Sequence, residues 1–267
     1  MGKNSEIMLW EKDIPGYNSM YGDEAPSITP FILEGGRGKA AIIICPGGAY
    51  RMRAALEGAP LAHWLNTMGI SAFVLNYRVA PYRYPYPLYD AKRAIRLVRF
   101  HAEQWQINPE QIGIMGFSAG GHLAASAATF FDYGNPDAAD PIDRLSSRPA
   151  LSILGYPVIT FGEFHPLGGS QLNLLGENPG KELIDRLSLE NSVTKDNPPV
   201  FLWHTTEDKS VPVENSLLLA GILSKNKVPF ELHIFPNGRH GLGMAPENPE
   251  VAVWLDLCTA WLKARGF

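Results

Sequence analysis

A serine between two glycines is the feature of this chain best suited to chemistry. Residues 116–120 read G-F-S-A-G, with the apolar run 111–115 before them and the small residues of 121–128 after them. A strand, the pattern G-x-S-x-G and a helix together form a sharp turn that holds a serine hydroxyl clear of the backbone. The motif alone is weak, but this context predicts that Ser118 is a nucleophile.

A serine hydroxyl needs a base to take its proton, and at turns of this kind the partners follow in the order Ser, Asp or Glu, His. Four histidines come late enough in the chain: His165, His204, His233 and His240. His233 lies inside an alternating strand, His165 lies before any suitable acid, and His204 would invert the order. His240 follows the last strand in a glycine-containing loop from which it could reach the serine. We therefore predict that His240 is the base.

The acid that orients this base should lie at the end of the preceding strand. Glu207 and Asp208 both follow the predicted strand 199–204, and only one of them can point at the histidine. Asp208, three residues before Val211, is predicted to be the acid, since it would hold the imidazole and stabilise its positive charge. Glu207 is expected to be a solvated neighbour.

The tetrahedral intermediate of acyl transfer needs N–H donors aimed at its oxyanion, each worth on the order of 3–4 kcal/mol. One donor should be the N–H of Ala119, directly after the nucleophile. The other should come from the loop after the strand 39–45, where residues 46–50 read P-G-G-A-Y. Its glycines allow close approach of backbone N–H groups to a substrate. We assign Gly48 and Ala49 to this role, without deciding which of them donates.

Strand-like and helix-like segments alternate along the chain, which predicts an α/β fold with a mostly parallel sheet and helices on both faces. The predicted strands are 39–45, 71–78, 111–115, 150–160, 199–204 and 229–235, with weaker signals at 7–10 and 28–33. The predicted helices are 54–68, 88–102, 121–128, 213–226 and 247–264. We expect a single domain over residues 1–267, in which about 161–197 form a small cap or pocket wall.

Composition argues against several function classes. The net charge of −4 and the absence of a Lys/Arg cluster give no footprint for nucleic acid or a membrane surface. Cys45 and Cys258 are expected to be buried and free. No apolar leader or run of transmembrane length is present, so a cytoplasmic protein is expected. No metal-ligand spacing or nucleotide-binding motif occurs, and no cofactor or metal is predicted.

Five motifs occur together and in order in this chain. They are Pro46-Gly47-Gly48-Ala49-Tyr50, Glu57-Gly58, Asn76-Tyr77-Arg78-Val79, the segment 84–90 (Y-P-Y-P-L-Y-D) and the segment 116–122 (G-F-S-A-G-G-H). The chain thereby resembles the small bacterial α/β-hydrolases of the acetyl-esterase and xylan-esterase-like group, relatives of the hormone-sensitive-lipase and feruloyl-esterase families. The resemblance covers about residues 39–243. One departure is the loop P-G-G-A, where many relatives have H-G-G-G, although its backbone donors survive the change.

The resemblance implies an α/β-hydrolase fold and hydrolysis of short acyl esters, often acetyl groups on plant-derived sugars. The expected partner is a small-molecule ester, for instance an acetylated oligosaccharide, and a homo-oligomer built on the edge strand or the C-terminal helix is compatible with it. Three alternatives remain: a feruloyl esterase, an arylformamidase or other small amide hydrolase, and a non-catalytic binding protein with the same fold. Rates on acetyl, feruloyl and N-formyl or anilide substrates would separate them.

Three further residues are candidates for substrate binding. Tyr50 ends the loop that carries the oxyanion donors, and Tyr84 belongs to a proline-rich loop whose tyrosines could either stack on a sugar or pack over the sheet. Arg78 ends a strand at the carboxyl edge, where ligands bind in open α/β sheets. It could orient a substrate, but an ion pair with Asp90 or Glu57 is the favoured interpretation.

Overall fold

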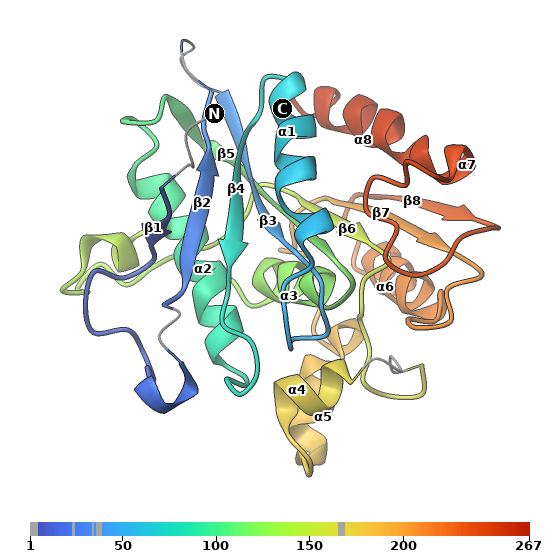
Figure 1. Ribbon diagram of the computed structural model, residues 1–267, viewed down its shortest axis with the longest axis horizontal. Coiled ribbons are helices and arrows are strands. Elements are labelled where there is room, and N and C mark those ends of the chain that lie inside the picture. Colours follow the sequence, from blue (N-terminus) through green and yellow to red (C-terminus); the bar gives the residue numbers. More distant parts are fainter. Residues whose placement is uncertain (1–4, 23–24, 34, 36–38, 165–168) are drawn as a thin grey trace.

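The structure is a computed structural model that describes residues 5–22, 25–33, 35, 39–164 and 169–267. Its described part contains an eight-stranded sheet in the order β1-β2-β4-β3-β5-β6-β7-β8 (Figure 1). The first two strands pair antiparallel, as do β2 and β4, and every pairing from β4 to β8 is parallel. The strands are β1 Ile7–Met8, β2 Ser27–Phe31, β3 Lys39–Cys45, β4 Ser71–Asn76, β5 Ile107–Phe117, β6 Ser152–Gly155, β7 Val200–Thr205 and β8 Phe230–Phe235. The predicted mostly parallel sheet is therefore confirmed.

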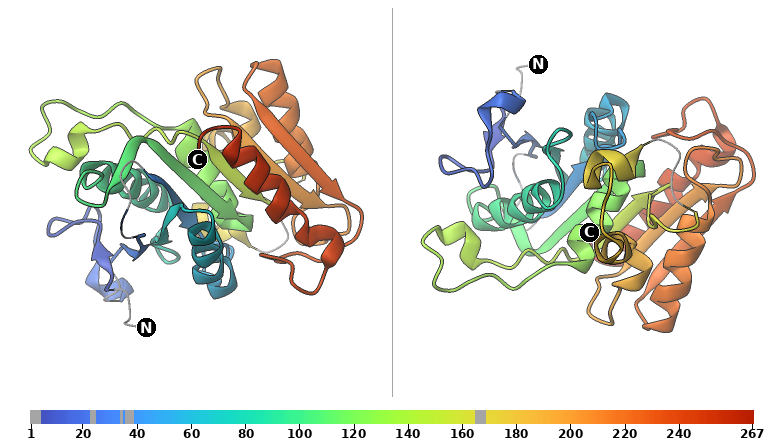
Figure 2. Two further views of the ribbon diagram at one scale, coloured as in Figure 1. Left: turned by 90° about the horizontal axis from the view of Figure 1, so that it is seen from above. Right: turned by 90° about the horizontal axis from the view of Figure 1, so that it is seen from below.

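Helices lie on both sides of this twisted sheet (Figure 2). Helices α2, α3 and α6 pack their apolar residues into one core, and α1 and α8 pack theirs into the other. The α-helices are α1 Ala59–Thr67, α2 Tyr86–Phe100, α3 Ser118–Thr129, α4 Ser170–Leu175, α5 Lys181–Leu187, α6 Glu214–Lys225, α7 Pro249–Ala252 and α8 Trp254–Lys263. The 3₁₀-helices are η1 Ser19–Tyr21, η2 Ala55–Glu57, η3 Pro141–Arg144 and η4 Leu189–Asn191.

The unbroken apolar run of β3 is explained by its place in the middle of the sheet. Successive side chains of a strand point to opposite faces, so a strand covered by helices on both sides is apolar throughout. Ala41, Ile43 and Cys45 accordingly belong to one core, and Ile42 and Ile44 to the other. Both cysteines are buried and free, as predicted.

Two predicted helices differ from the structure. The expected helix 54–68 is a 3₁₀ turn, η2, followed by α1, because the chain changes direction at Gly58 and Pro60 then stands in the first turn of α1. The expected helix 247–264 is likewise divided into α7 and α8, with Val253 between them. The strand expected at 111–115 is longer than predicted and spans Ile107–Phe117.

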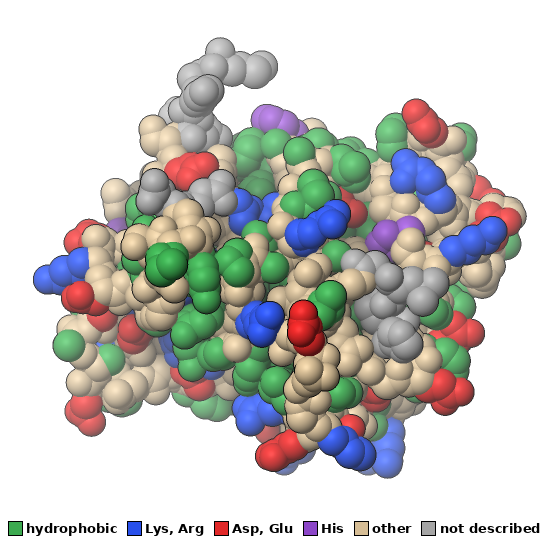
Figure 3. Space-filling view, turned by 60° about the horizontal axis from the view of Figure 1, so that its bottom comes forward, with side chains coloured by type: hydrophobic (Ala, Val, Ile, Leu, Met, Phe, Trp, Pro, Cys, Tyr) green, Lys and Arg blue, Asp and Glu red, His purple; other side chains and the backbone are tan. Residues whose placement is uncertain are grey.

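The carboxyl end of β4 lies at the lower edge of the sheet in Figure 1, where α4 and α5 project, and the twist of the sheet turns the carboxyl end of β8 to the right. These helices and η4 form the described part of the predicted insertion 161–197, which we call the cap segment. With this edge brought forward, hydrophobic side chains gather across the middle of the face and Lys and Arg lie around them (Figure 3). Among the described residues, no helix is long and apolar enough to span a membrane.

Candidate active site

Ser118 occupies a strained turn between β5 and α3. Its φ of 53° lies in the left-handed region, which a residue with a side chain adopts only at a cost. The neighbouring glycines make the turn sterically feasible. A Cβ at Gly116 would lie 2.1 Å from the Gly120 carbonyl oxygen, and a Cβ at Gly120 would lie 2.1 Å from the Cys45 oxygen. The turn therefore requires glycine at both positions.

Three residues from separate loops meet at this turn. The Ser118 hydroxyl lies 2.8 Å from Nε2 of His240, and Nδ1 of His240 lies 2.6 Å from Oδ2 of Asp208. An ionised carboxylate can only accept, so Nδ1–H donates to Asp208 and leaves Nε2 free to accept the serine proton. The structure thus brings together the three residues that the sequence predicts as nucleophile, base and acid.

Asp208 is held in its ionised form by several donors. Its Oδ1 accepts the N–H groups of Ser210 and Val211, both at 2.9 Å. Burial raises the pKa of Asp208, but hydrogen bonds from His204 and His240 and the charge of His240 outweigh burial, so the pKa lies well below its usual range. His204 was predicted not to be the base, and it lies beneath the acid with its Nε2 3.4 Å from Asp208 Oδ2.

The loop of residues 46–50, called the oxyanion loop below, lies against the nucleophile. A Cβ at Gly47 would lie 3.0 Å from the Ser118 Cβ, so the two backbones nearly touch. Gly48 and Ala49 both have positive φ, 129° and 54°. Within the described part of the chain, the N–H groups of Gly48, Ala49 and Ala119 have no hydrogen-bond acceptor. Their assignment to the oxyanion stays a prediction, with which this lack of a partner is compatible.

The cap segment is attached to the same loop. The side-chain amide of Asn173, on α4, donates to the Ala49 carbonyl oxygen at 2.7 Å. His122, on α3, bonds the carbonyl oxygen of Leu187 through Nε2 and accepts the hydroxyl of Tyr50 through Nδ1, both at 2.8 Å. Burial lowers the pKa of His122 to about 4, although the Leu187 bond opposes this shift. His122 is therefore a neutral link between cap, helix and loop.

The remaining acid and histidine candidates lie outside the catalytic array. Glu207 is exposed and accepts the N–H of Gly238 at 3.1 Å, so it braces the loop that carries the predicted base. His233 lies in β8 and its Nε2 is 2.8 Å from Glu231. His165 lies outside the described residues.

Two of the three predicted substrate-binding residues are occupied elsewhere. Arg78 is buried and its guanidinium makes a two-pronged pair with Asp90, at 2.7 Å for the shortest bond, and a further bond to the Pro15 oxygen. The ion-pair interpretation therefore holds for Asp90, and substrate binding by Arg78 is wrong because its donors face inward. Tyr50 is buried and donates to His122, so its hydroxyl does not face a substrate.

Tyr84, the third candidate, lies between the proline-rich loop and the cap. Its N–H donates to the Leu174 oxygen at 2.9 Å and its ring packs against the core. Its neighbour Tyr82 is buried and bonds the backbone of Asn18. For these two tyrosines the structure favours the packing interpretation over a sugar-binding rim.

Sequence reasoning missed two residues beside the array, Glu57 and Tyr156. Glu57 is buried under the oxyanion loop, and Tyr156 directly follows β6 with its ring centroid 5.0 Å from that of His240. Glu57 entered the sequence analysis as a motif residue and as a possible partner of Arg78, but it bonds Gly47 and Tyr156 instead. Nothing local in the sequence marks Tyr156, because its partners lie far away along the chain.

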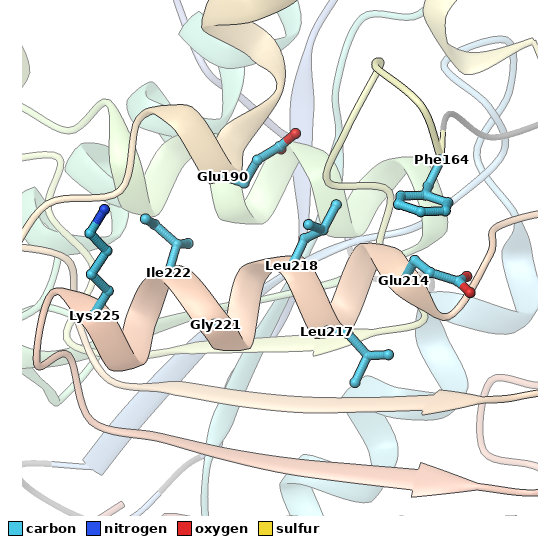
Figure 4. Close-up of a pocket in the computed structure, with 8 residues that line it drawn as sticks. All are labelled: Phe164, Glu190, Glu214, Leu217, Leu218, Gly221, Ile222 and Lys225. Atoms are coloured by element: carbon cyan, nitrogen blue, oxygen red, sulfur yellow. The ribbon is translucent and has the colours of Figure 1, made fainter.

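An apolar groove of about 490 Å³ lies elsewhere on the molecule and contains none of these residues. It runs along α6 beneath Phe164 and Glu190, and Leu218 and Ile222 of α6 point toward that side (Figure 4). In the described residues, no cluster of three or more His, Cys, Asp or Glu side chains is placed to hold a metal ion. The array of Ser118, His240 and Asp208 remains the candidate site.

Comparison with known proteins gives a consistent set of relatives. The profile of the family described as BD-FAE matches residues 34–223. The crystal structure of the acetyl ester-xyloside bifunctional hydrolase from Caldicellulosiruptor lactoaceticus is 51% identical, covers 99% of this chain and 97% of its own, and superposes with a TM-score of 0.97. The α/β-hydrolase fold expected from the resemblance is therefore confirmed.

Two curated relatives are longer than this chain. The endo-1,4-beta-xylanase B of Butyrivibrio fibrisolvens is 38% identical over 247 residues, which are 90% of this chain and 38% of that protein. The acetylxylan esterase of Xylanibacter ruminicola is 36% identical over 218 residues, which are 80% of this chain and 43% of that protein. The chain therefore spans about two fifths of the length of these two proteins.

Proposed function

Because the chain belongs to the BD-FAE family, we propose that it is a serine esterase that removes short acyl groups, chiefly acetyl, from xylo-oligosaccharides or similar sugars. The observation that carries the proposal is the array in which Ser118 Oγ lies 2.8 Å from His240 and His240 lies 2.6 Å from Asp208. This geometry matches what a base-activated serine requires. The substrate class is proposed from the names of the acetylxylan esterase and acetyl ester hydrolase relatives.

The proposed reaction is acyl transfer to water in two steps. His240 takes the proton of Ser118 as Oγ attacks the ester carbonyl, and the N–H groups of Ala119 and of Gly48 or Ala49 stabilise the oxyanion. His240, held by Asp208, then gives that proton to the leaving sugar hydroxyl. A water molecule, deprotonated by the same histidine, attacks the acyl-serine and releases acetate and the free serine.

The name of the Caldicellulosiruptor relative also mentions a xyloside. Glycoside hydrolysis usually needs two carboxyl groups that face the scissile bond. Two carboxyl groups lie beside the array, and both are engaged internally. Asp208 binds His240 and two backbone N–H groups, and Glu57 binds Gly47 and Tyr156. The proposal is therefore confined to esters.

A substrate panel tests this function against its alternatives. Initial rates would be measured on p-nitrophenyl acetate, butyrate and octanoate, on acetylated xylo-oligosaccharide, on a methyl ferulate and on an N-formyl anilide. We expect rates that fall steeply with acyl length and clear release of acetate from the oligosaccharide. A preference for the feruloyl ester or for the amide would replace the proposal by a feruloyl esterase or an arylformamidase. No turnover of any of these substrates would favour a binding protein.

A further inference from the structure

A carboxyl group with no part in the proposed reaction lies directly beneath the oxyanion loop. Glu57, the last residue of η2, is 3% exposed. Its Oε2 accepts the N–H of Gly47 at 2.7 Å. A Cβ added at Gly47 would lie 2.6 Å from this oxygen and 3.0 Å from the Cβ of Ser118. Only one glycine therefore separates the carboxyl group from the nucleophile.

The second oxygen of Glu57 reaches toward the base. Its Oε1 accepts the hydroxyl of Tyr156 at 2.5 Å, and the Tyr156 oxygen in turn accepts the N–H of Gly243 at 2.9 Å. Gly243 belongs to residues 236–243, called the histidine loop here, and the Tyr156 ring packs edge-on against His240 with their centroids 5.0 Å apart. One carboxyl group thus connects the loop that carries the oxyanion donors with the loop that carries the base.

The hydrogen-bond pattern indicates that Glu57 is ionised. Tyr156 already accepts the Gly243 N–H, and in the described part of the chain its own proton has no acceptor other than Glu57. A protonated carboxyl group would compete with that proton, whereas a carboxylate accepts it. The pKa of Glu57 is raised on balance, because burial outweighs the bonds from Tyr156 and Gly47 and the charge of His240, which lower it.

Few other titratable groups face this carboxyl group or the base. Tyr77 and Tyr156 face Glu57 besides His240, and both tyrosines are buried. Asp208 binds the ring of His240, and the neighbouring guanidinium of Arg239 donates to the carbonyl oxygen of that histidine. Glu57 is therefore a second buried carboxylate whose charge acts on the histidine, and it is connected to that histidine through Tyr156.

We propose that Glu57 is a positioning residue that locks the oxyanion loop to the histidine loop and stabilises the imidazolium formed when His240 takes the Ser118 proton. The inference rests on the proposed esterase function. A buried carboxylate costs free energy that a neutral side chain of the same shape avoids. A purely structural tether would therefore work as well with glutamine, whereas an electrostatic role would not.

The test compares pH profiles of kcat and kcat/KM on p-nitrophenyl acetate for the wild type and Glu57→Gln. Glutamine keeps the shape, accepts the Gly47 N–H and donates to the Tyr156 oxygen, so it removes the charge and the acceptor of the tyrosine proton; only the loss of charge displaces the acidic limb. We expect kcat to fall about tenfold and the acidic limb to move to lower pH by about one unit, because the base is harder to protonate without the nearby charge. An unchanged acidic limb would overturn the proposal.

Two controls keep the result interpretable. Glu207→Gln removes an exposed carboxylate that also binds the histidine loop, and its acidic limb should stay in place because solvent screens its charge. If the acidic limb of Glu207→Gln moved as far as that of Glu57→Gln, the effect would be a general one of charge, which contradicts a specific role for Glu57. The second control, Tyr156→Phe, removes the hydroxyl that joins Glu57 to Gly243 but leaves the charge of Glu57 in place.

Tyr156→Phe also decides the matter if Glu57→Gln does not fold. We expect kcat to fall several-fold with KM and the acidic limb unchanged, since the loop connection is lost but the carboxylate remains. A kcat equal to that of the wild type would overturn the positioning role. A wild type that does not hydrolyse p-nitrophenyl acetate would instead contradict the proposed function, so the two failures are distinguishable.

Discussion

In the proposed mechanism, Asp208 acts by fixing the tautomer of the base. Its carboxylate accepts Nδ1–H of His240 and the N–H groups of two following residues, and its pKa is held low by His204 and His240 against the effect of burial. An ionised acceptor at this position keeps the lone pair of Nε2 directed at Ser118. In the proposed mechanism, the reactivity of the serine thus depends on a residue that never touches it.

Asp208→Asn should therefore lower kcat on p-nitrophenyl acetate by about ten-thousand-fold, because the amide donates to Nδ1 and leaves the proton on Nε2. KM should change little. The measurement is steady-state kinetics of the purified variant, with the thermal midpoint recorded to confirm folding. A loss smaller than about tenfold would show that Asp208 does not orient the base.

The three array residues could be predicted from the sequence because each lies within a few residues of the end of a recognisable strand and because their order along the chain is informative. The contact of Glu57 with Tyr156 could not, since the two residues are 99 positions apart and meet only where η2 packs beside the end of β6. For Arg78 the favoured ion pair with Asp90 is present, although nothing in the local sequence shows that the pair is buried.

At the level of elements, the turn at Ser118 depends on how closely β5 and α3 pack. A Cβ at Gly116 would lie 2.1 Å from the oxygen and 2.5 Å from the carbon of the Gly120 carbonyl, which is rigid backbone. By contrast, Gly221 in the middle of α6 has no atom within 4 Å of an added Cβ, and it faces the open groove of Figure 4.

These two glycines should respond oppositely to alanine. Gly116→Ala should lower the free energy of unfolding by more than about 3 kcal/mol or prevent folding, because the backbone of the turn at Ser118 must move. Gly221→Ala should raise it by about 0.5–1 kcal/mol through helix propensity. Urea unfolding of both variants measures the free energy of unfolding. A value for Gly116→Ala equal to that of the wild type would contradict the close packing of strand and helix.

Among the described residues of the cap segment, Asn173 reaches the oxyanion loop with its side chain. Asn173→Ala removes the bond to the Ala49 oxygen, so we expect kcat on p-nitrophenyl acetate to fall three- to tenfold as the loop loses its fixed position. Gln171→Ala, on the same helix α4, is the matched control and should keep the wild-type rate. Equal rates in all three proteins would show that the cap does not support the donors.

Across the whole molecule, the sheet order could be anticipated only in part. The alternating pattern predicted the parallel strands, but the short antiparallel β1 and the exact break between η2 and α1 depend on tertiary contacts. The N-terminal segment, for example, is held by bonds of Arg78 and Tyr82 to Pro15 and Asn18. Such contacts between distant segments leave no periodicity in the sequence.

The stability of the whole fold should depend on pH through His122. Burial lowers its pKa to about 4 in the folded protein, against an ordinary value of 6.5, so the unfolded chain binds a proton more readily. The contribution of neutral His122 to the free energy of unfolding is fully present above pH 6.5. It is lost as the pH falls toward 4, and the whole loss is about 3 kcal/mol.

Thermal unfolding measured between pH 7.5 and pH 4.5 checks that the stability falls as the pH falls. The wild-type midpoint should fall steadily below pH 6.5, and His122→Gln, which cannot titrate, should show a weaker dependence over the same range. At pH 7.5 the wild type should have the higher midpoint of the two proteins, because the bonds of His122 to Tyr50 and Leu187 are intact. Parallel curves for the two proteins would exclude His122 as the source.

The most direct test of the account is acetate release from acetylated xylo-oligosaccharide by the wild type and Ser118→Ala. We predict steady release by the wild type and a loss of about 10⁵-fold or more in the variant, because no other described hydroxyl lies against His240. Equal release by both proteins would contradict the assignment of Ser118 as the nucleophile and, with it, the proposed mechanism.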